Sequence, residues 1–525
     1  MYTNDGIYLG LSDSGQRICL PLSMANRHGL IAGASGTGKT ITMKVLAESF
    51  SDAGVPVFLC DVKGDVSGIC QPGVQSESME KRIDKFSIRD SFSYKGYPTV
   101  FWDIYQEEGH PIRATISDVG PELLSRILGL TEVQEGVLNI VFRIADDNGL
   151  LLIDLKDLRA MLAHVTDHRA EYAMTYGAIS PQSLAAILRS LLPLERQGGD
   201  LFFGEPDLDI LDWMGRDSEG RGRINLLSCV KLVRNPTLYA SFLLWMLSEL
   251  FERLPEAGDL DKPKLVFFFD EAHMLFSDAP KVLVKNIEQM VKLIRSKGVG
   301  VYFVTQSPSD IPDSVLAQLS NRIQHALRAY TPAEQKAVRA AAQAFRPNPA
   351  FKTEEVITQL GVGHALVSVL DSEGVPGVVE QCSILCPQSL MAPADESCRR
   401  AARSADGMEK YDEMVDRESA FELLEDRRAA EARSAQLAAE REAFEKEKAA
   451  YEAQKAKEEE AARKKAEKEA EAARKKLEKQ LEREELQRQK VVERRRAQLE
   501  RQIINTGTQV LKRGIMGTLF GGKKR

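Results

Sequence analysis

A glycine-rich segment near the start of this 525-residue chain constrains its fold more than any other feature. Gly33-Ala34-Ser35-Gly36-Thr37-Gly38-Lys39-Thr40 follows the apolar run Leu30-Ile31-Ala32 and precedes a helix-like stretch. Glycines let the backbone turn tightly and direct its N–H groups at phosphate oxygens, and a following helix adds the positive end of its dipole. The spacing G-x-x-x-x-G-K-T therefore predicts a strand, a phosphate-binding loop and a helix. In such a loop Lys39 reaches the β- and γ-phosphates and Thr40 binds Mg²⁺.

A pair of acids at a second strand end indicates hydrolytic chemistry. Leu265-Val-Phe-Phe-Phe269 is a run of five apolar residues, typical of a strand buried on both faces, and Asp270 and Glu271 follow it. Beside a phosphate loop, Asp270 is expected to polarise a water on Mg²⁺ and Glu271 to activate the attacking water. The alternative is that the two acids cap the next helix. Asp270-Glu271-Ala272-His273 also matches the tetrapeptide of DEAH-box helicases, but the remaining motifs of that class are not found.

Two further predicted strands end in polar residues. Val55 to Asp61 is apolar up to its final carboxylate, and a polar, glycine-punctuated loop follows at 62–68. Gly298 to Thr305 is followed by Gln306, which is placed to sense the γ-phosphate or the attacking water. Ligands of open α/β sheets bind at the carboxyl ends of the strands, so both residues are candidates for the site. For Gln306, a plain polar strand end is the alternative.

The chain divides into five predicted parts around an α/β fold with a mainly parallel sheet. Residues 1–27 are a short β segment, 28–117 and 256–395 are the two parts of the nucleotide-binding core, and 118–255 are a mainly helical insertion. Residues 396–525 are a charged tail. Between 418 and 505 the tail has no Gly or Pro, and its large apolar residues do not sustain a heptad. This favours a solvated single helix or a weak coiled coil.

Charge and cysteine usage narrow the class of protein further. The net charge is −7, yet residues from Glu471 onward carry 16 Lys and Arg against 7 Asp and Glu. The basic, amphipathic end at 510–525 could dock on a protein partner, a neighbouring subunit or an anionic membrane surface, and a frayed tail is the alternative. The seven cysteines are scattered without zinc spacing, which suits a reducing cytosol. With no signal peptide and no apolar run long enough to span a membrane, we predict a cytoplasmic protein.

Taken in order, the motifs resemble the HerA–FtsK superfamily of P-loop ATPases, and within it a bacterial branch of HerA-like proteins. The resemblance is carried by the phosphate loop, Asp61-Val62-Lys63-Gly64-Asp65, the acid pair in its DEAH-type tetrapeptide and Thr305-Gln306. It implies a RecA-like core that uses ATP and Mg²⁺, assembles into a hexameric ring and translocates duplex DNA.

The resemblance also implies roles for individual residues. Asp61 matches the acid after the second strand, Gln306 the polar sensor, and Arg295 an arginine of the helix before that strand. Arg27 is the candidate for an arginine finger supplied to a neighbouring subunit, with Arg322 as the alternative; such a finger stabilises charge in the transition state.

Two departures keep other functions open. HerA proteins carry a β-barrel before the ATPase, whereas about 25 residues precede the phosphate-loop strand here, and the charged tail is not part of the HerA core. An ATPase switch or assembly factor that acts on proteins or membranes through its tail is therefore the main alternative to a DNA motor. A P-loop kinase is a third possibility, but a water-activating Glu271 beside the phosphates would waste ATP.

Overall fold

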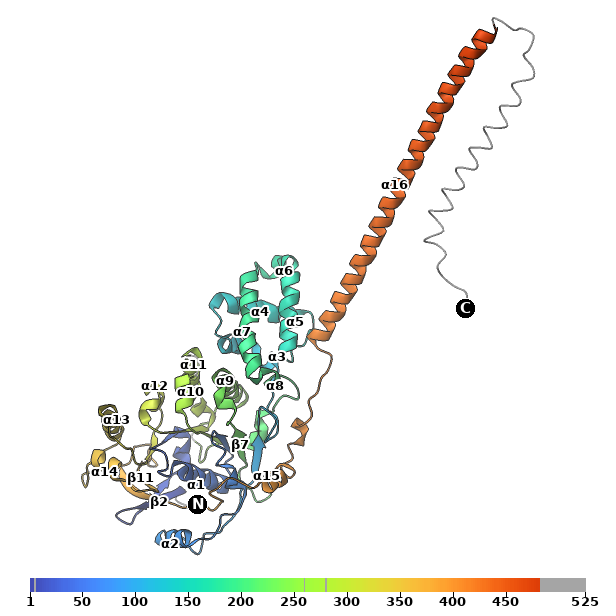
Figure 1. Cartoon of the computed structure of the whole chain (residues 1–525). Coiled ribbons are helices and arrows are strands. Elements are labelled where there is room, and N and C mark those ends of the chain that lie inside the picture. Colours follow the sequence, from blue (N-terminus) through green and yellow to red (C-terminus); the bar gives the residue numbers. More distant parts are fainter. Residues whose placement is uncertain (4–5, 259, 279–280, 482–525) are drawn as a thin grey trace. The chain divides into compact units, whose positions relative to one another are not determined.

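The computed structural model describes residues 1–3, 6–258, 260–278 and 281–481, shown in Figure 1. Met1–Arg427 form one compact unit, and a second unit begins at Arg428. The predicted basic end at 510–525 lies outside the described residues.

One sheet organises the first unit, and the predicted α/β fold with a RecA-like, mainly parallel sheet is confirmed. Seven neighbouring strands are parallel, in the order β10 (Asn321–Gln324), β4 (Gly29–Ala32), β9 (Val299–Thr305), β8 (Leu265–Phe269), β5 (Val57–Asp61), β7 (Ile224–Ser228) and β6 (Thr99–Trp102). Beyond β10 the sheet continues antiparallel with β11 (His364–Ser368), β12 (Glu380–Ile384), β2 (Gly6–Ser12), β1 (Tyr2–Thr3) and, paired with β2, β3 (Arg17–Leu20).

Both faces of the parallel strands are buried, because successive side chains of a strand point to opposite sides. Phe267 belongs to a core with the helices of one face, where α9 (Pro236–Arg253) packs beside α11 (Lys281–Ile294). Its neighbour Phe268 faces the other way and meets Phe50 of α1 (Lys39–Asp52), with ring centroids 6.3 Å apart. The apolar runs in the sequence thus become strands covered by a helical layer on each side.

The remaining helices fill the insertion and the end of the unit. The insertion contributes α3 (Ile116–Ile127), α4 (Glu132–Asp147), α5 (Leu155–Asp167), α6 (Arg169–Tyr176), α7 (Pro181–Leu194) and α8 (Asp200–Phe202). Elsewhere lie α2 (Glu77–Lys85), α10 (His273–Asp278), α12 (Asp313–Leu316), α13 (Pro332–Gln343), α14 (Thr353–Gln359) and α15 (Glu396–Arg403). Figure 1 shows α4 to α7 gathered in one group. The insertion also contains α9 and the strand β7, which lies inside the main sheet.

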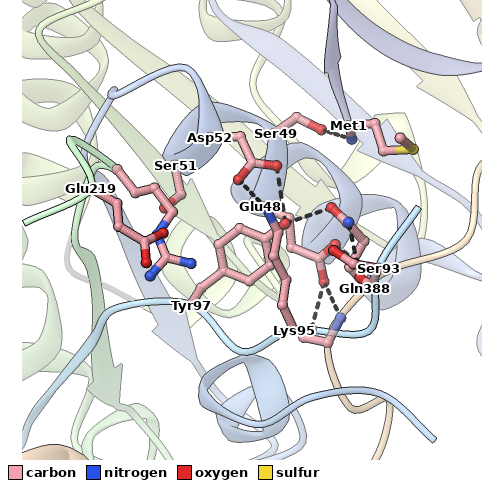
Figure 2. A network of polar contacts seen from close by, with 12 residues as sticks. Met1, Glu48, Ser49, Ser51, Asp52, Ser93, Lys95, Tyr97, Glu219 and Gln388 are labelled. Carbon is pink, nitrogen blue, oxygen red and sulfur yellow. Dashed lines mark hydrogen bonds and ion pairs between the residues drawn. The ribbon is translucent and has the colours of Figure 1, made fainter. Parts of the chain in front are cut away.

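A buried polar cluster fixes the C-terminal half of α1 (Figure 2). Glu48 accepts hydrogen bonds from the backbone of Gln388 (2.8 Å) and Ser389 (3.1 Å) and from the Ser389 hydroxyl (2.5 Å). The Tyr97 hydroxyl lies 2.8 Å from Gln388 Oε1 and 3.1 Å from Asp52 Oδ2. These contacts hold the helix that begins at the glycine-rich loop against the segment at 388–389.

Two segments that the sequence analysis separated from the core belong to the first unit. Residues 1–27 supply β1 to β3, which extend the main sheet through the pairing of β2 with β12. Residues 396–427, assigned to the tail, pack on the core: Arg113 Nη1 donates to Tyr411 O (2.9 Å), and Leu424 is 1% exposed. The segment is polar on average, so its composition did not reveal the few apolar and charged residues that attach it to the core.

The second unit, as far as it is described, consists of the continuation of α16 (Ala420–Leu481). Its described side chains are exposed, and the helix carries ion pairs between residues four apart, such as Lys446 with Glu442 and Lys464 with Glu460. Such pairs stabilise an isolated helix without tertiary packing. Among the described helices, none combines the length and apolar character needed to cross a membrane.

Candidate functional site

Polar residues follow several parallel strands and meet at the carboxyl edge of the sheet. Gly33 follows β4, Gln306 follows β9, and Asp270 follows β8. Asp61 is the last residue of β5, and His325 follows β10. Because β9 lies between β4 and β8, one strand separates the glycine-rich loop from the acid pair, and that strand carries Gln306.

The glycine-rich loop adopts a backbone that requires its glycines. Gly33, Gly36 and Gly38 have φ angles of +153°, +75° and +116°, a region that other residues rarely adopt. A Cβ added at Gly33 would lie 2.5 Å from the Cβ of His325. The loop is thus pressed against the end of β10, while its crest at Ser35 and Gly36 is exposed.

Lys39 is enclosed by the loop that precedes it. Its Nζ donates to the carbonyl oxygens of Gly33 (2.6 Å) and Ala34 (3.2 Å), and the residue is 6% exposed. The Thr37 hydroxyl also donates to Ala34 O (2.7 Å). Burial lowers the pKa of Lys39, while the nearby carboxylate of Glu271 opposes that shift. The ammonium group is therefore held inside the loop and on the side of the acid pair.

Thr40 and Asp270 offer the oxygen ligands that suit Mg²⁺. Thr40 is partly exposed at the start of α1. Asp270 is 2% exposed, and its Oδ2 makes no hydrogen bond within the described residues. Burial, together with the charge of Glu271, raises the pKa of Asp270 to about 7. A buried carboxylate without a partner is costly, and a divalent cation would offset that cost. The residues present therefore fit a Mg²⁺ ion.

Glu271, in contrast, is surrounded by partners. Lys63 forms an ion pair with its Oε1, Gln306 Nε2 donates to its Oε2 (3.3 Å), and His273 Nδ1 lies 3.1 Å from the same oxygen. Burial alone would raise the pKa of Glu271, but Lys63 and its other neighbours lower it below the ordinary value. Glu271 also has a left-handed φ of +46°, which is uncommon for a non-glycine residue. The structure thus holds a charged, oriented carboxylate at this edge.

Asp61 acts on this arrangement through the loop that follows it. Its carboxylate accepts the backbone N–H groups of Gly64 (2.7 Å) and Val66 (3.0 Å). Burial raises its pKa to about 6. Because these bonds fix the loop that carries Lys63, they also place the Lys63 ammonium beside Glu271.

The structure does not bring the three candidate arginines to this edge. Arg27 ends a short 3₁₀ helix, η1 (Leu22–Arg27), before the first residue of β4, and Arg295 starts η6 (Arg295–Lys297) before β9. Both therefore lie at the amino edge of the sheet, opposite the glycine-rich loop. Arg322 is within β10, where its guanidinium donates to the backbone oxygens of Leu319 (3.0 Å), Ala344 (2.8 Å) and Leu316 (3.1 Å). These bonds give Arg322 a structural role.

Three residues of the site received no role from the sequence. Lys63 was part of a loop recognised as polar, and His273 completed a tetrapeptide, but neither had a partner assigned. His325 lies beneath the glycine-rich loop, with Nε2 2.8 Å from Thr42 Oγ1 and Nδ1 3.0 Å from His364 O. Burial lowers the pKa of His325 to about 4, so the imidazole is neutral. A basic residue after a strand was the available signal for Lys63; His325 had none beyond its place at a strand end.

Comparisons with known proteins find one matching family model and several similar solved structures. The family model described as "Helicase HerA-like C-terminal" matches residues 8–525. Among solved structures, the bacterial conjugative coupling protein TrwB in its unbound form has a TM-score of 0.48 and 14% identity, covering 75% of this chain and 92% of that chain. VirB4 of Thermoanaerobacter pseudethanolicus has a TM-score of 0.43 and 15% identity, covering 73% of this chain and 97% of that chain. Among curated protein sequences, none matches the chain.

Proposed function

The chain belongs to the helicase HerA-like C-terminal family, and from this premise we propose that it is a motor ATPase that hydrolyses ATP with Mg²⁺ as its cofactor. The observation that carries the proposal is the environment of Glu271. A carboxylate that is 4% exposed, held by Lys63 and Gln306 next to Asp270, whose Oδ2 makes no hydrogen bond in the described structure, suits a base that removes a proton from water.

Each residue at the carboxyl edge of the sheet then has one role in ATP hydrolysis. Backbone N–H groups of Gly33–Gly38 and the ammonium of Lys39 bind the phosphates of ATP. Thr40 and Asp270 would hold Mg²⁺, and the bound ion would neutralise charge on the phosphate oxygens. Glu271 accepts the proton of the attacking water, and Gln306 orients that water while bonded to Glu271. Asp61 keeps Lys63 in place.

The primary test is ATP turnover by the full-length protein with and without duplex DNA, combined with its native mass. A HerA-type motor is expected to be hexameric and to hydrolyse ATP faster when duplex DNA is present. A monomer whose turnover ignores DNA would contradict the motor function while leaving ATP hydrolysis intact.

In the proposed ring, Arg27 completes the site of a neighbouring subunit. Arg27 cannot serve the glycine-rich loop of its own chain, because β4 separates the two. Arg295, which lies at the same edge, is the second candidate for contact with a neighbour. Subunit mixing tests this. Arg27→Ala subunits keep an intact loop, and Glu271→Gln subunits keep Arg27, so each alone should be inactive. A mixture should regain turnover if Arg27 acts in trans, and no recovery would exclude that role.

A switch or assembly factor that acts through its C-terminal helix is the second candidate function. Leu437, Phe444 and Tyr451 favour it, because these exposed residues recur every seven positions along α16 and offer an apolar stripe to a protein partner. Removing residues 428–525 separates the two functions. The motor should keep DNA-stimulated turnover, whereas the assembly factor should keep basal turnover and lose its partner.

A further inference from the structure

Two cysteines far apart in the sequence meet beside the loop that carries Lys63. Cys70 ends η2 (Ser67–Cys70), and Cys398 lies in the first turn of α15. Their sulfur atoms are 3.8 Å apart, and both residues are partly exposed. A disulfide needs a sulfur–sulfur distance of about 2.0 Å, so the two sulfur atoms would have to come closer by roughly 1.8 Å.

Hydrogen bonds already link the two segments that carry these cysteines. Gln71 Nε2 donates to Asp395 Oδ2 (3.3 Å), and the Asp395 N–H donates to Gln71 Oε1 (3.2 Å). The Ala394 N–H donates to the Ser67 hydroxyl (3.0 Å). These bonds bring the two segments together without the sulfur atoms, so the cysteines are held within reach of one another.

We propose that Cys70 and Cys398 form a reversible disulfide when the protein meets hydrogen peroxide. The Cys398 sulfur attacks one peroxide oxygen, the O–O bond breaks, and a sulfenic acid and one water form. The Cys70 sulfur then attacks the sulfenic sulfur, the S–S bond forms, and the oxygen leaves as a second water with the Cys70 proton. Two thiols are oxidised and one peroxide is reduced to two waters.

The order of the two attacks follows from the surroundings of the Cys70 sulfur. Burial and the neighbouring Cys398 raise the pKa of Cys70 to about 12, which makes it the poorer nucleophile. Cys398 is therefore the residue that meets the peroxide, and Cys70 resolves the sulfenic acid.

The disulfide would tie the Lys63 loop to α15. Asp61 holds Gly64 and Val66, and η2 with Cys70 follows directly. If hydrolysis requires Lys63 to move away from Glu271, oxidation should slow turnover several-fold, and dithiothreitol should restore it. This consequence rests on the proposed ATPase function, whereas the bond itself does not.

The test treats the full-length protein with hydrogen peroxide and maps disulfide-linked peptides by mass spectrometry. We expect a Cys70–Cys398 linked peptide in the wild type and in a Cys19→Ser control, and its loss in Cys70→Ser and in Cys398→Ser. Absence of the linked peptide from the oxidised wild type would overturn the proposal. If the linked peptide forms and turnover is unchanged, the disulfide site is supported, but its proposed control of the Lys63 loop is wrong. A protein inactive in both redox states would count against the ATPase function alone.

Discussion

Glu48 and Glu271 are both buried in the first unit, but their surroundings differ. Both oxygens of Glu48, in the C-terminal half of α1, accept hydrogen bonds from the Gln388–Ser389 segment, so its carboxyl group is matched by fixed donors. Glu271 and its neighbour Asp270 stand at the carboxyl edge of the sheet. There Asp270 keeps a buried oxygen without a hydrogen bond in the described structure, and Glu271 adopts a left-handed backbone.

The contrast separates polar groups that stabilise the fold from those that serve chemistry. Glu48 finds hydrogen-bond partners for both of its oxygens, which adds to stability, whereas the unpaired Oδ2 of Asp270 and the left-handed backbone of Glu271 cost free energy. Such costs persist at sites that act on a ligand. The same substitution should therefore have opposite consequences at positions 48 and 271.

Glu271→Gln should produce the largest effect on activity. Loss of a general base lowers the rate by roughly 10²–10⁴-fold. Glutamine keeps the size of the side chain and a hydrogen-bonding oxygen, so ATP binding and thermal stability should remain close to wild type. Steady-state turnover and the binding of a fluorescent ATP analogue measure the two quantities. Turnover at the wild-type rate would show that Glu271 is not the base.

Lys39→Ala should weaken ATP binding. Hydrogen bonds to charged groups contribute about 1.5–3 kcal/mol, which corresponds to a loss of affinity of about 10–100-fold. Lys81→Ala is a suitable control, because Lys81 is exposed on α2 and pairs with Glu77 one turn away. Titration calorimetry with ATP and Mg²⁺ compares the variants. Equal affinity in both would argue against a phosphate-binding role for the glycine-rich loop.

Glu48→Gln should reverse the pattern of Glu271→Gln. The amide would present a donor to groups that now donate to a carboxylate, and an unsatisfied buried group costs about 1–3 kcal/mol in the free energy of unfolding. The turnover of the folded protein should stay unchanged, because Glu48 contacts the segment at 388–389 and not the edge of the sheet. Urea unfolding and turnover, measured on the same samples, test both parts. Reduced turnover with unchanged stability would erase the distinction between the two glutamates.

The sequence predicts which residues lie at the carboxyl edge of the sheet better than it predicts the contacts between them. Asp270, Glu271 and Gln306 were placed correctly because a buried strand shows as an apolar run, and the next polar residue marks its carboxyl end. The partnership of Lys63 with Glu271 depends on a loop conformation set by Asp61 and on β5 lying next to β8, which no local pattern encodes. The structure confirms where the residues at this edge lie, and their roles in binding and catalysis, like those of Arg27 and Arg295, stay predictions.

The docking of residues 396–427 was missed for a related reason. The average composition of this segment is that of a charged tail, but contacts made by a few individual residues hold it on the core. The segment is held in part by ion pairs with His110, a fully buried residue in the first unit. His110 Nδ1 lies 2.7 Å from Asp412 Oδ1, and its Nε2 lies 3.1 Å from Asp406. Like Glu48, His110 has polar partners, here one for each ring nitrogen. We therefore expect His110 to stabilise the fold rather than to take part in chemistry.

A change of pH should reveal the contribution of His110 and give the smallest of these effects. Burial alone lowers the pKa of His110, but Asp406 and Asp412 outweigh it and raise the pKa above the ordinary value. A histidine whose pKa is raised on folding contributes full stability below its unfolded pKa of about 6.5, and loses that contribution as the pH rises through the folded pKa. The difference in unfolding free energy between the wild type and His110→Gln should therefore be larger near about pH 6 than near about pH 9. Urea unfolding of both proteins at the two pH values measures it, and a difference that grows with pH would show that the imidazole is buried neutral.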